Sequence, residues 1–353
     1  MAGDLLLVGS VPLETVEHVM RMFGAPLGPY LESIPDGEVG DRRWWVLRLS
    51  WQVFLGHPEL ELLKRPAPEN GVERLVPRDR GDVYAFKVKP GVDVVRFGDP
   101  GWRLGFTRDA INSYFVFKML KKEGVIPPHV RFQVSLPLVN SVVTVLTFPV
   151  QGDLERVRPG YEHALGEEIR KIVEIVPPEE LAIQWDCSWE ITDVYGGIPS
   201  APTAGAIERN LGQIQRLSPL IPKEAILGFH FCFGTFGGWP RFAPDDLGAA
   251  VDLANAAVET AGRNVNWIHI PALDRTDDAF YAPLKELKLR EARLYLGLIH
   301  SMASFPERLK VARKYAPPFG IAAYCGFGRM SPEMLPQVIE EHIEALRIAN
   351  ETI

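Results

Sequence analysis

Residues 225–234 read Ala-Ile-Leu-Gly-Phe-His-Phe-Cys-Phe-Gly. The continuous apolar run over 225–231 predicts a strand that is covered on both faces, as in a parallel sheet. His230 and Cys232 are two residues apart, so both side chains point to the same side of an extended chain. Imidazole and thiolate groups together are typical zinc ligands. The stretch therefore predicts half of a metal site at the end of a buried strand.

Seven further strand-like segments occur along the chain, and most are followed by a segment with helical periodicity. The eight predicted strands lie at 4–8, 31–34, 131–136, 181–185, 225–231, 265–270, 293–299 and 321–324. The predicted helices lie at 13–23, 42–55, 108–123, 154–176, 203–217, 244–261, 305–315 and from 332 to the C-terminus. Alternation of this kind requires parallel strands joined by crossover helices. Eight such units favour a (β/α)8 barrel of the TIM type over a doubly wound open sheet.

Residues 58–105 interrupt this alternation, because they are rich in Pro, Gly and charged residues. Two runs with alternating apolar residues, 83–88 and 92–97, predict a β-hairpin within them. No internal repeat or low-complexity linker marks a second domain. We therefore expect one barrel domain over residues 1–353, with 58–105 as an insertion after its second unit.

Charge and composition exclude several classes of protein. The chain has 38 basic and 45 acidic residues, a net charge of −7, so neither nucleic acid nor an anionic membrane is an expected partner. Three cysteines do not make a disulfide framework and suit a reducing compartment. The N-terminal segment lacks the basic region of a signal peptide, and no apolar run approaches the roughly 20 residues of a membrane helix. We expect a cytoplasmic protein that acts on a small molecule, in an oligomeric state that the sequence leaves open.

Polar side chains gather where the predicted strands end, which is where a barrel places its chemistry. These residues are Ser10, Asp36, Glu38, Asp186, Cys187, His230, Cys232, His269, His300, Ser301 and Cys325. Packing alone does not require all three cysteines and three of the eight histidines at strand ends. His230, Cys232 and Cys325 would lie on different strands of one barrel mouth, within reach of one zinc ion.

Each of these residues also has an ordinary structural interpretation. Ser10 could close a tight turn or cap a helix, and Asp186 could cap the turn that follows it. Glu38 could form an ion pair with an arginine of the next helix. A single buried His or Cys is usually hydrogen-bonded or packed in the core. The three tryptophans within 44–51 are interpreted as core or insertion packing rather than as part of a substrate site.

The order of these features resembles the C-terminal catalytic domain of cobalamin-independent methionine synthase, a zinc-dependent (β/α)8 barrel family related to the uroporphyrinogen decarboxylase superfamily. The likeness extends over nearly the whole chain. Its motifs are Val-Gly-Ser-Val-Pro at 8–12, Asp-Gly-Glu at 36–38, Ile-Gln-Trp-Asp at 183–186, His-Phe-Cys at 230–232, Leu-Ile-His-Ser at 298–301 and Cys-Gly at 325–326. The resemblance implies that His230, Cys232 and Cys325 bind Zn2+.

The resemblance also implies how a substrate would be held. Ser10 matches the family residue that holds the carboxylate of an amino-acid acceptor. Glu38 and Asp186 match the two carboxylates that bind its amino group. His300 matches the proposed proton donor of the family.

The chain departs from the family pattern near strand six and in its folate-binding features. The family's fourth protein ligand is a Glu, which falls here on Ile270 or Pro271. His269 and Asp274 lie nearby, but neither aligns with it cleanly. A catalytic zinc ion with three protein ligands and one open position is also common. The family's N-terminal barrel has no counterpart in this sequence, and Ser-Leu-Pro at 135–137 replaces a folate-associated Trp. These departures argue against polyglutamyl folate as a donor in the usual way.

Three functions are compatible with these residues. The first is a zinc-dependent methyl or alkyl transfer to a thiol acceptor, with the thiolate as nucleophile and His300 as the acid. The second uses zinc as a Lewis acid in a lyase or hydrolase reaction on an aromatic or hydroxylated small molecule. The third is a zinc- or ligand-binding barrel without catalysis. A bulky or aromatic donor is indicated by aromatic residues near the predicted mouth, which are Trp185, Trp189, Phe231, Phe233, Phe236 and Trp239.

Overall fold

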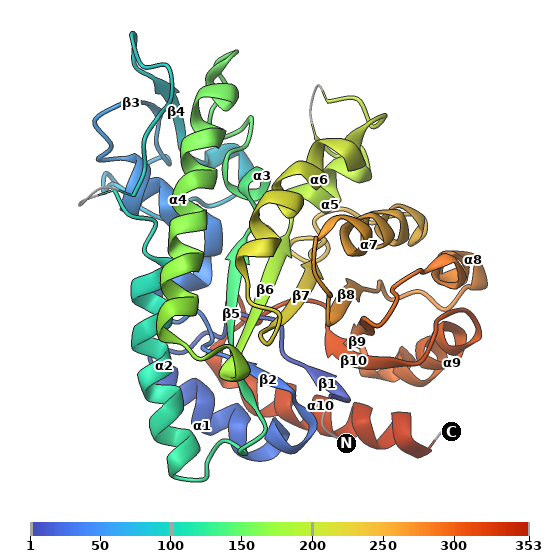
Figure 1. Cartoon of the computed structure of the whole chain (residues 1–353). Coiled ribbons are helices and arrows are strands. Elements are labelled where there is room, and N and C mark those ends of the chain that lie inside the picture. The colour runs from blue at the N-terminus through green and yellow to red at the C-terminus, as the bar shows by residue number, and fades with distance from the viewer. Residues whose placement is uncertain (1–2, 99–101, 199–200, 352–353) are drawn as a thin grey trace.

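The computed structural model of the chain describes residues 3–98, 102–198 and 201–351. Within these ranges, eight parallel strands form the wall of a barrel and helices pack around its outside (Figure 1). The strands are β1 (Leu5–Leu6), β2 (Ser33–Pro35), β5 (Arg131–Pro137), β6 (Leu181–Cys187), β7 (Ile226–Phe231), β8 (Trp267–Pro271), β9 (Arg293–Ile299) and β10 (Phe319–Ala323). Their order around the wall is β1-β10-β9-β8-β7-β6-β5-β2. The predicted (β/α)8 barrel is confirmed.

Closure of the wall depends on side chains as well as on strand pairing. A single parallel bridge, between Leu5 and Leu31, joins β1 to the segment that leads into β2. β1 is only two residues long, so strand pairing holds little of this part of the chain. The chain after it is held by the buried amide of Gln184, which donates to the carbonyl of Val8 at 2.5 Å. Gln184 is linked in turn to Gln133 on β5 at 2.9 Å. These buried hydrogen bonds fix the loop after β1 beside the ends of β5 and β6.

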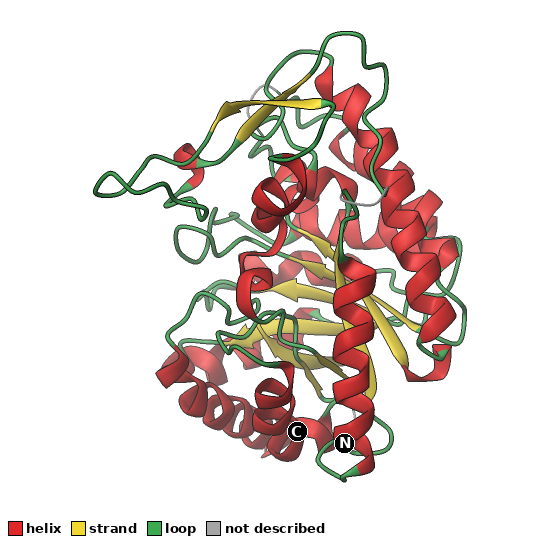
Figure 2. Cartoon of the chain, turned by 90° about the vertical axis from the view of Figure 1, so that its left-hand side faces the viewer, coloured by secondary structure: helices red, strands yellow, loops and turns green. Residues whose placement is uncertain are grey.

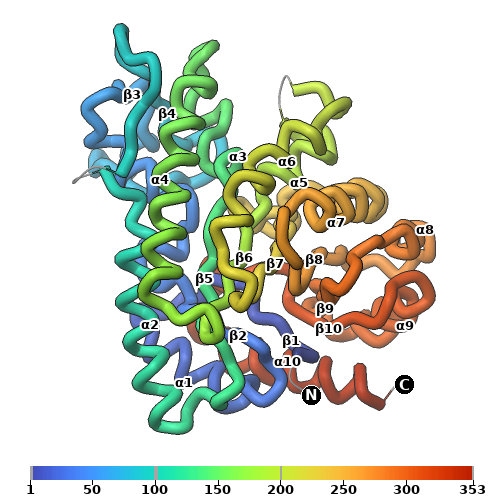
Figure 3. The backbone as a smooth tube through the Cα atoms, viewed as in Figure 1, coloured from blue at the N-terminus to red at the C-terminus, as the bar shows by residue number. Residues whose placement is uncertain are grey.

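Helices from all parts of the chain cover the barrel. The longer ones are α1 (Val16–Leu27), α2 (Phe106–Lys122), α4 (Asp153–Ile175), α6 (Ala206–Leu217), α7 (Gly248–Thr260), α9 (Phe305–Tyr315) and α10 (Leu335–Glu351). The short helices α3 (Val139–Val142), α5 (Trp189–Val194) and α8 (Asp278–Tyr281) follow β5, β6 and β8. Short 3₁₀ turns lie at Gly28–Tyr30, Arg80–Asp82, Pro178–Glu180, Ser218–Leu220, Ala282–Glu286, Met302–Ser304 and Pro332–Met334. Figure 3 shows α1 and α10, from opposite ends of the chain, side by side.

The strands in the middle of the wall carry the core. Every residue of β6, β7 and β8 is buried, as their largely apolar sequences predict. Among the helices of the described residues, none is both long and apolar enough to cross a membrane.

The insertion contains a hairpin, but its strands differ from the predicted pair. β3 (Leu60–Lys64) pairs antiparallel with β4 (Ala85–Val88), at the top of the view in Figure 2, and residues 92–97 are not a strand. Val95 is buried, and its N–H donates to the carbonyl of Arg156 in α4 at 2.9 Å. A Cβ at Gly160 would lie 1.8 Å from the Val95 carbonyl oxygen. The predicted second strand was wrong because this segment packs on a helix backbone, where a glycine leaves room for it.

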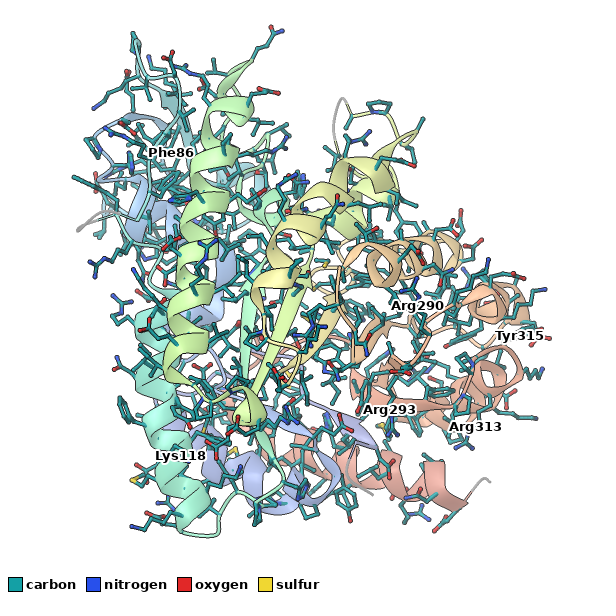
Figure 4. All side chains as sticks on the ribbon, in the orientation of Figure 1. Phe86, Lys118, Arg290, Arg293, Arg313 and Tyr315 are labelled. Carbon is teal, nitrogen blue, oxygen red and sulfur yellow. The ribbon has the colours of Figure 1, made fainter. Side chains whose placement is uncertain are left out.

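The helix predicted over 42–55 was also wrong, because this segment is irregular. Gly40–Leu47 forms 3₁₀ turns that are broken at Trp45, whose φ of 49° is left-handed, and Ser50–Phe54 forms a π-helical turn. Left-handed backbone is costly for a residue with a side chain, and π-helical turns are frequent at functional sites. The ring of Phe54 packs edge-on against Phe86 of the hairpin, with centroids 5.8 Å apart. Figure 4 labels Phe86 near the top of the view. This contact ties the irregular segment to the insertion.

Candidate metal centre and its cavity

Three soft ligands converge at the carboxyl ends of the strands. His230 lies near the end of β7, Cys232 follows that strand, and Cys325 follows β10. Their ligand atoms all lie within 4.8 Å of one another, and the two Sγ atoms are 3.3 Å apart. His230 Nε2 is buried and has no hydrogen-bond partner among the described residues. An unpartnered imidazole nitrogen beside two thiols is costly unless the three groups bind a common ion.

The thiols of Cys232 and Cys325 have pKa values that are shifted in opposite directions. The hydrogen bond from Cys325 lowers the pKa of the Cys232 thiol well below its ordinary value, against the effect of burial and with help from His230. The same hydrogen bond, together with burial, raises the pKa of Cys325. The N–H of Gly234 also donates to Cys232 Sγ at 3.4 Å. A divalent soft cation would compensate for a second thiolate here, so these donors fit zinc.

No fourth His, Cys, Asp or Glu joins this group within the described residues. The Glu expected from the resemblance falls on Ile270 or Pro271 at the end of β8, and neither side chain can bind a metal ion. His269 lies behind His230, with the two Nδ1 atoms 2.7 Å apart, and its other ring nitrogen is 3.1 Å from the carbonyl of Ala323. Asp274 is exposed to solvent. Neither of these two residues therefore completes the ligand set.

Two carboxylates lie in the same cavity as the metal ligands. Asp186 is opposite His230 in the β6–β7 ladder and accepts a hydrogen bond from Gln184 Nε2 at 2.6 Å. Burial and the negative charge of Glu38 raise the pKa of Asp186 well above its ordinary value. Burial, followed by the charge of Asp36, raises the pKa of Glu38 to about 7. A cation beside these carboxylates would relieve their repulsion.

Glu38 reaches the cavity from a strained turn. Its φ of 45° is left-handed, a conformation that costs free energy in a residue with a side chain. Asp36 stabilises this turn, because its carboxylate accepts from the N–H of Glu38 at 2.9 Å and from Arg42 and Ser113 at 2.6 Å each. Arg42 therefore forms its ion pair with Asp36, and Glu38 lines the cavity.

Ser10 is buried against the loop that carries Cys325. The N–H of Phe327 donates to the carbonyl of Ser10 at 2.5 Å. A Cβ at Gly326 would lie 2.6 Å from Ser10 N, and one at Gly328 would lie 2.7 Å from Ser10 Cβ. The two glycines therefore let the loop after β10 lie directly on the loop after β1. As a result, the three predicted ligands and the three predicted substrate-binding residues line one cavity.

His300 is the one predicted site residue that does not line this cavity. Its Nε2 lies 2.8 Å from the carbonyl of Ala272 and 2.9 Å from Arg308 Nη1. Burial and the positive charge of Arg308 lower the pKa of His300 to about 4. Trp239 and Tyr324 stack at 4.2 Å, and both rings meet His300 edge-on. In this conformation the imidazole is neutral at physiological pH and is engaged outside the cavity.

The cavity encloses about 1180 Å³, part of it open to solvent, between two unlike walls. The strand-end wall contains the metal ligands, the two carboxylates and Ser10. The outer wall comes from the irregular segment within 44–54, residues 80–84 of the insertion and the loop after β5 at 141–147. Its largest apolar side chains are Trp44, Trp45, Leu47, Phe54, Tyr84 and Leu146. The cavity can therefore hold a polar group at the strand ends and an apolar body against the outer wall.

Sequence reasoning missed most of the outer wall. Trp44 and Trp45 were interpreted as core or insertion packing, but both are half-buried and line the cavity. Of the aromatic residues predicted near the mouth, Trp189 and Phe236 line the cavity. Trp185 lies in the core instead, where its indole N–H donates a hydrogen bond to a serine of the helix layer. The signal in the sequence that could have indicated these residues was the density of tryptophan in a segment of weak helical periodicity.

Three arginines of the cavity were also missed. Arg241 donates to the carbonyl of Ser188 at 2.9 Å, and Arg329 donates to Thr235 Oγ1 at 2.6 Å. Arg80, from the insertion, lies 3.5 Å from the carbonyl of Arg241. These side chains could receive an anionic group of a ligand. No motif predicts them, because residues far apart in the sequence come together only in the folded chain.

The comparison with solved structures identifies a protein of the same architecture. The chain shares its fold with a B12-independent methionine synthase. That enzyme is from Shewanella sp. W3-18-1 and was solved in complex with selenomethionine; the TM-score is 0.60 and the sequence identity is 14%, over 100% of this chain and 98% of that chain. No family model matches the sequence, and no curated protein does. The resemblance seen in the sequence is therefore confirmed at the level of the fold.

Proposed function

We propose that this protein is a zinc-dependent enzyme that transfers a methyl or another alkyl group to a thiol, with the metal held by His230, Cys232 and Cys325. The observation that carries the proposal is that this ligand group and the carboxylates of Glu38 and Asp186 line one cavity. Nitrogen and sulfur donors select zinc, and three protein ligands leave a position for a substrate. The likeness of fold to a methionine synthase supports the same class of reaction by analogy.

The strand-end wall suits an acceptor that resembles an amino acid. A zinc ion bound there would lower the pKa of a thiol that it coordinates, so that the thiol is ionised near neutral pH. Glu38 and Asp186 would bind the ammonium group, because an ammonium restores the ionised form of two carboxylates whose pKa values are raised. The hydroxyl of Ser10 would donate to the acceptor's carboxylate.

The transfer itself requires one bond to form and one to break. The sulfur of the acceptor forms a bond to the donor's alkyl carbon, while the bond from that carbon to the leaving group breaks and the leaving group keeps the electron pair. A proton then neutralises the leaving group. His300 is our candidate for this acid. Its ring would have to leave Arg308 to enter the cavity, and only away from the burial and the positive charge that lower its pKa would it carry the proton that it donates. The aromatic outer wall suits a donor with a bulky or aromatic body, and we do not expect polyglutamyl folate to bind in the usual way.

Metal analysis of the purified chain tests the proposal first. We expect about one zinc ion per chain. Homocysteine, an amino acid with a thiol side chain, should change the near-ultraviolet and visible spectrum of the cobalt-substituted protein, because a third sulfur ligand adds to the sulfur-to-cobalt charge transfer and alters the metal's coordination. A chain that takes up no metal with all three ligands intact would refute the proposal. An alkyl-transfer rate that His300→Asn leaves unchanged would remove His300 from the reaction.

A second candidate is a zinc-dependent lyase or hydrolase reaction in the same cavity. The pKa of Glu38, about 7, supports this alternative, because a group that titrates near the working pH is an efficient general acid or base. The two reactions differ in their need for a thiol. Product formed from an aromatic or hydroxylated substrate without any thiol would favour the second candidate, and metal binding without turnover of either kind would indicate a ligand-binding barrel.

A further inference from the structure

Behind the metal ligands, two imidazole rings on the neighbouring strands β7 and β8 are joined by a hydrogen bond. His269 on β8 is opposite His230 in the β7–β8 ladder, and the rings meet through their Nδ1 atoms at 2.7 Å. The second nitrogen of His269 lies 3.1 Å from the carbonyl oxygen of Ala323, at the end of β10. His269 is fully buried, so water does not compete for either hydrogen bond.

The order of these contacts determines which nitrogen carries each proton. The Ala323 carbonyl can only accept, so Nε2 of His269 must carry a hydrogen. Nδ1 of the neutral His269 ring then accepts, and the hydrogen between the two rings belongs to Nδ1 of His230. In the neutral His230 ring, Nε2 is then unprotonated, and it is the buried nitrogen that has no hydrogen-bond partner among the described residues. This is the form of imidazole that binds a metal.

We propose that His269 is a positioning residue for the metal site, because it holds His230 in the tautomer and ring orientation that offer Nε2 to an ion shared with Cys232 and Cys325. The inference rests on the proposed function, since it concerns the same metal. Outer-shell partners of this kind orient the ligand ring and increase its basicity.

The neighbouring strand leaves room for this side chain. A Cβ at Gly297 of β9 would lie 3.0 Å from Nε2 of His269, and 2.9 Å from the Cα atoms of both Pro271 and Tyr324. Any larger residue at 297 would displace the imidazole from its path to Ala323. The imidazole of His269 therefore fits in this place because residue 297 is a glycine. The backbone of β10, which leads to Cys325, is the far end of the same chain of hydrogen bonds.

The test compares the full-length protein with His269→Leu and His269→Asn. We expect His269→Leu to weaken zinc binding by about 10- to 100-fold, the usual effect of losing an outer-shell partner. His269→Asn should lose less, because its amide oxygen can still accept from Nδ1 of His230. His57 supplies a matched control, because it is buried, lies 2.8 Å through Nε2 from the carbonyl of Arg96, and accepts the N–H of Glu59 through Nδ1. His57→Leu should leave zinc affinity, measured by competition with a chelator, unchanged.

The tautomer of His230 can be read directly, and without metal, from long-range proton–nitrogen correlations of the histidine-labelled protein at a pH where the ring is neutral. We expect the Nδ1–H form in the unaltered chain and a mixture of both forms in His269→Leu. An Nε2–H form in the unaltered chain would overturn the inference, as would unchanged zinc affinity and tautomer in a folded His269→Leu variant. Because the tautomer needs no metal, failure of the unaltered chain to bind zinc would count against the proposed function separately.

Discussion

The two walls of the cavity are built by different means. On the strand-end wall, His230 and Asp186 project from a regular parallel ladder and are buried, and the other groups stand on the short loops that follow strands. On the outer wall, side chains such as Trp44 and Trp45 come from irregular turns and remain half-buried. Rigid elements hold reacting groups more accurately than loops do, and loops vary more easily. The comparison suggests that the strand ends determine the chemistry and the outer wall determines which donor is accepted.

The largest effect should come from removing a metal ligand. Cys232→Ala should abolish zinc binding, with a loss greater than the roughly 10- to 100-fold that an outer-shell change produces, because one of three protein ligands is missing. Zinc content after dialysis measures this. Cys187→Ala is the matched control, because Cys187 is also buried at the end of β6 and its sulfur forms a hydrogen bond with the carbonyl of Trp185, at 3.9 Å, instead of joining the ligand group. Equal loss of zinc in both variants would show that the strand-end wall is not specific.

A smaller effect is expected when a carboxylate of the strand-end wall is neutralised. Asp186→Asn should weaken homocysteine binding by roughly 10- to 100-fold, since a hydrogen bond to a charged group contributes about 1.5–3 kcal/mol. Zinc content should not change. Calorimetric titration of the zinc-loaded protein measures the affinity. Glu190→Gln provides the control, because Glu190 is buried on α5 but is hydrogen-bonded to Ser141 and Gln213; a similar loss there would contradict a specific role for Asp186.

The raised pKa of Glu38 predicts how the unliganded protein responds to pH. The folded state holds this proton more tightly than the unfolded chain, because the pKa rises from 4.5 to about 7 on folding. Its contribution to the free energy of unfolding is therefore fully present below the ordinary pKa and is lost as the pH rises through about 7. Affinity for an ammonium group should rise over the same range. Denaturant titrations of the wild type and Glu38→Gln measure the first effect as a difference, because burial also raises the pKa of Glu190 to about 7 and part of the pH dependence comes from that group. A pH dependence in Glu38→Gln equal to that of the wild type would remove Glu38 from the effect.

The smallest effect is expected on the outer wall. Trp44→Ala should weaken binding of an aromatic donor by about 3- to 10-fold, in line with the contribution of an aromatic contact beyond its buried area. Zinc and homocysteine should bind as before, because neither touches this wall. Trp102→Ala is a suitable control, since Trp102 packs on His57 at 5.6 Å and does not line the cavity. Loss of homocysteine affinity in Trp44→Ala would mean that the two walls are not independent.

The regular part of the barrel could be predicted closely from the sequence. The expected strand at 293–299 and helix at 305–315 have the bounds of β9 and α9. The apolar run of β9 can be recognised from neighbouring residues alone. Pro306 occupies the first turn of α9, where proline is favoured. The partner strand of the hairpin and the segment within 42–55 could not be predicted in the same way. Their backbone depends on contacts with α4 and on packing between aromatic rings, which no local periodicity reports.

By itself, the sequence determined the alternation of strands and helices, and it placed His230 and Cys232 on one side of a strand end. It also placed carboxylates at the ends of other predicted strands. Only the tertiary structure decided that Cys325 lies 3.3 Å from Cys232, that His269 supports His230 from behind, and that His300 is turned toward Arg308. The physical reason is that periodicity is a property of neighbouring residues. Ring orientation and barrel closure are instead set by contacts between residues far apart in the chain.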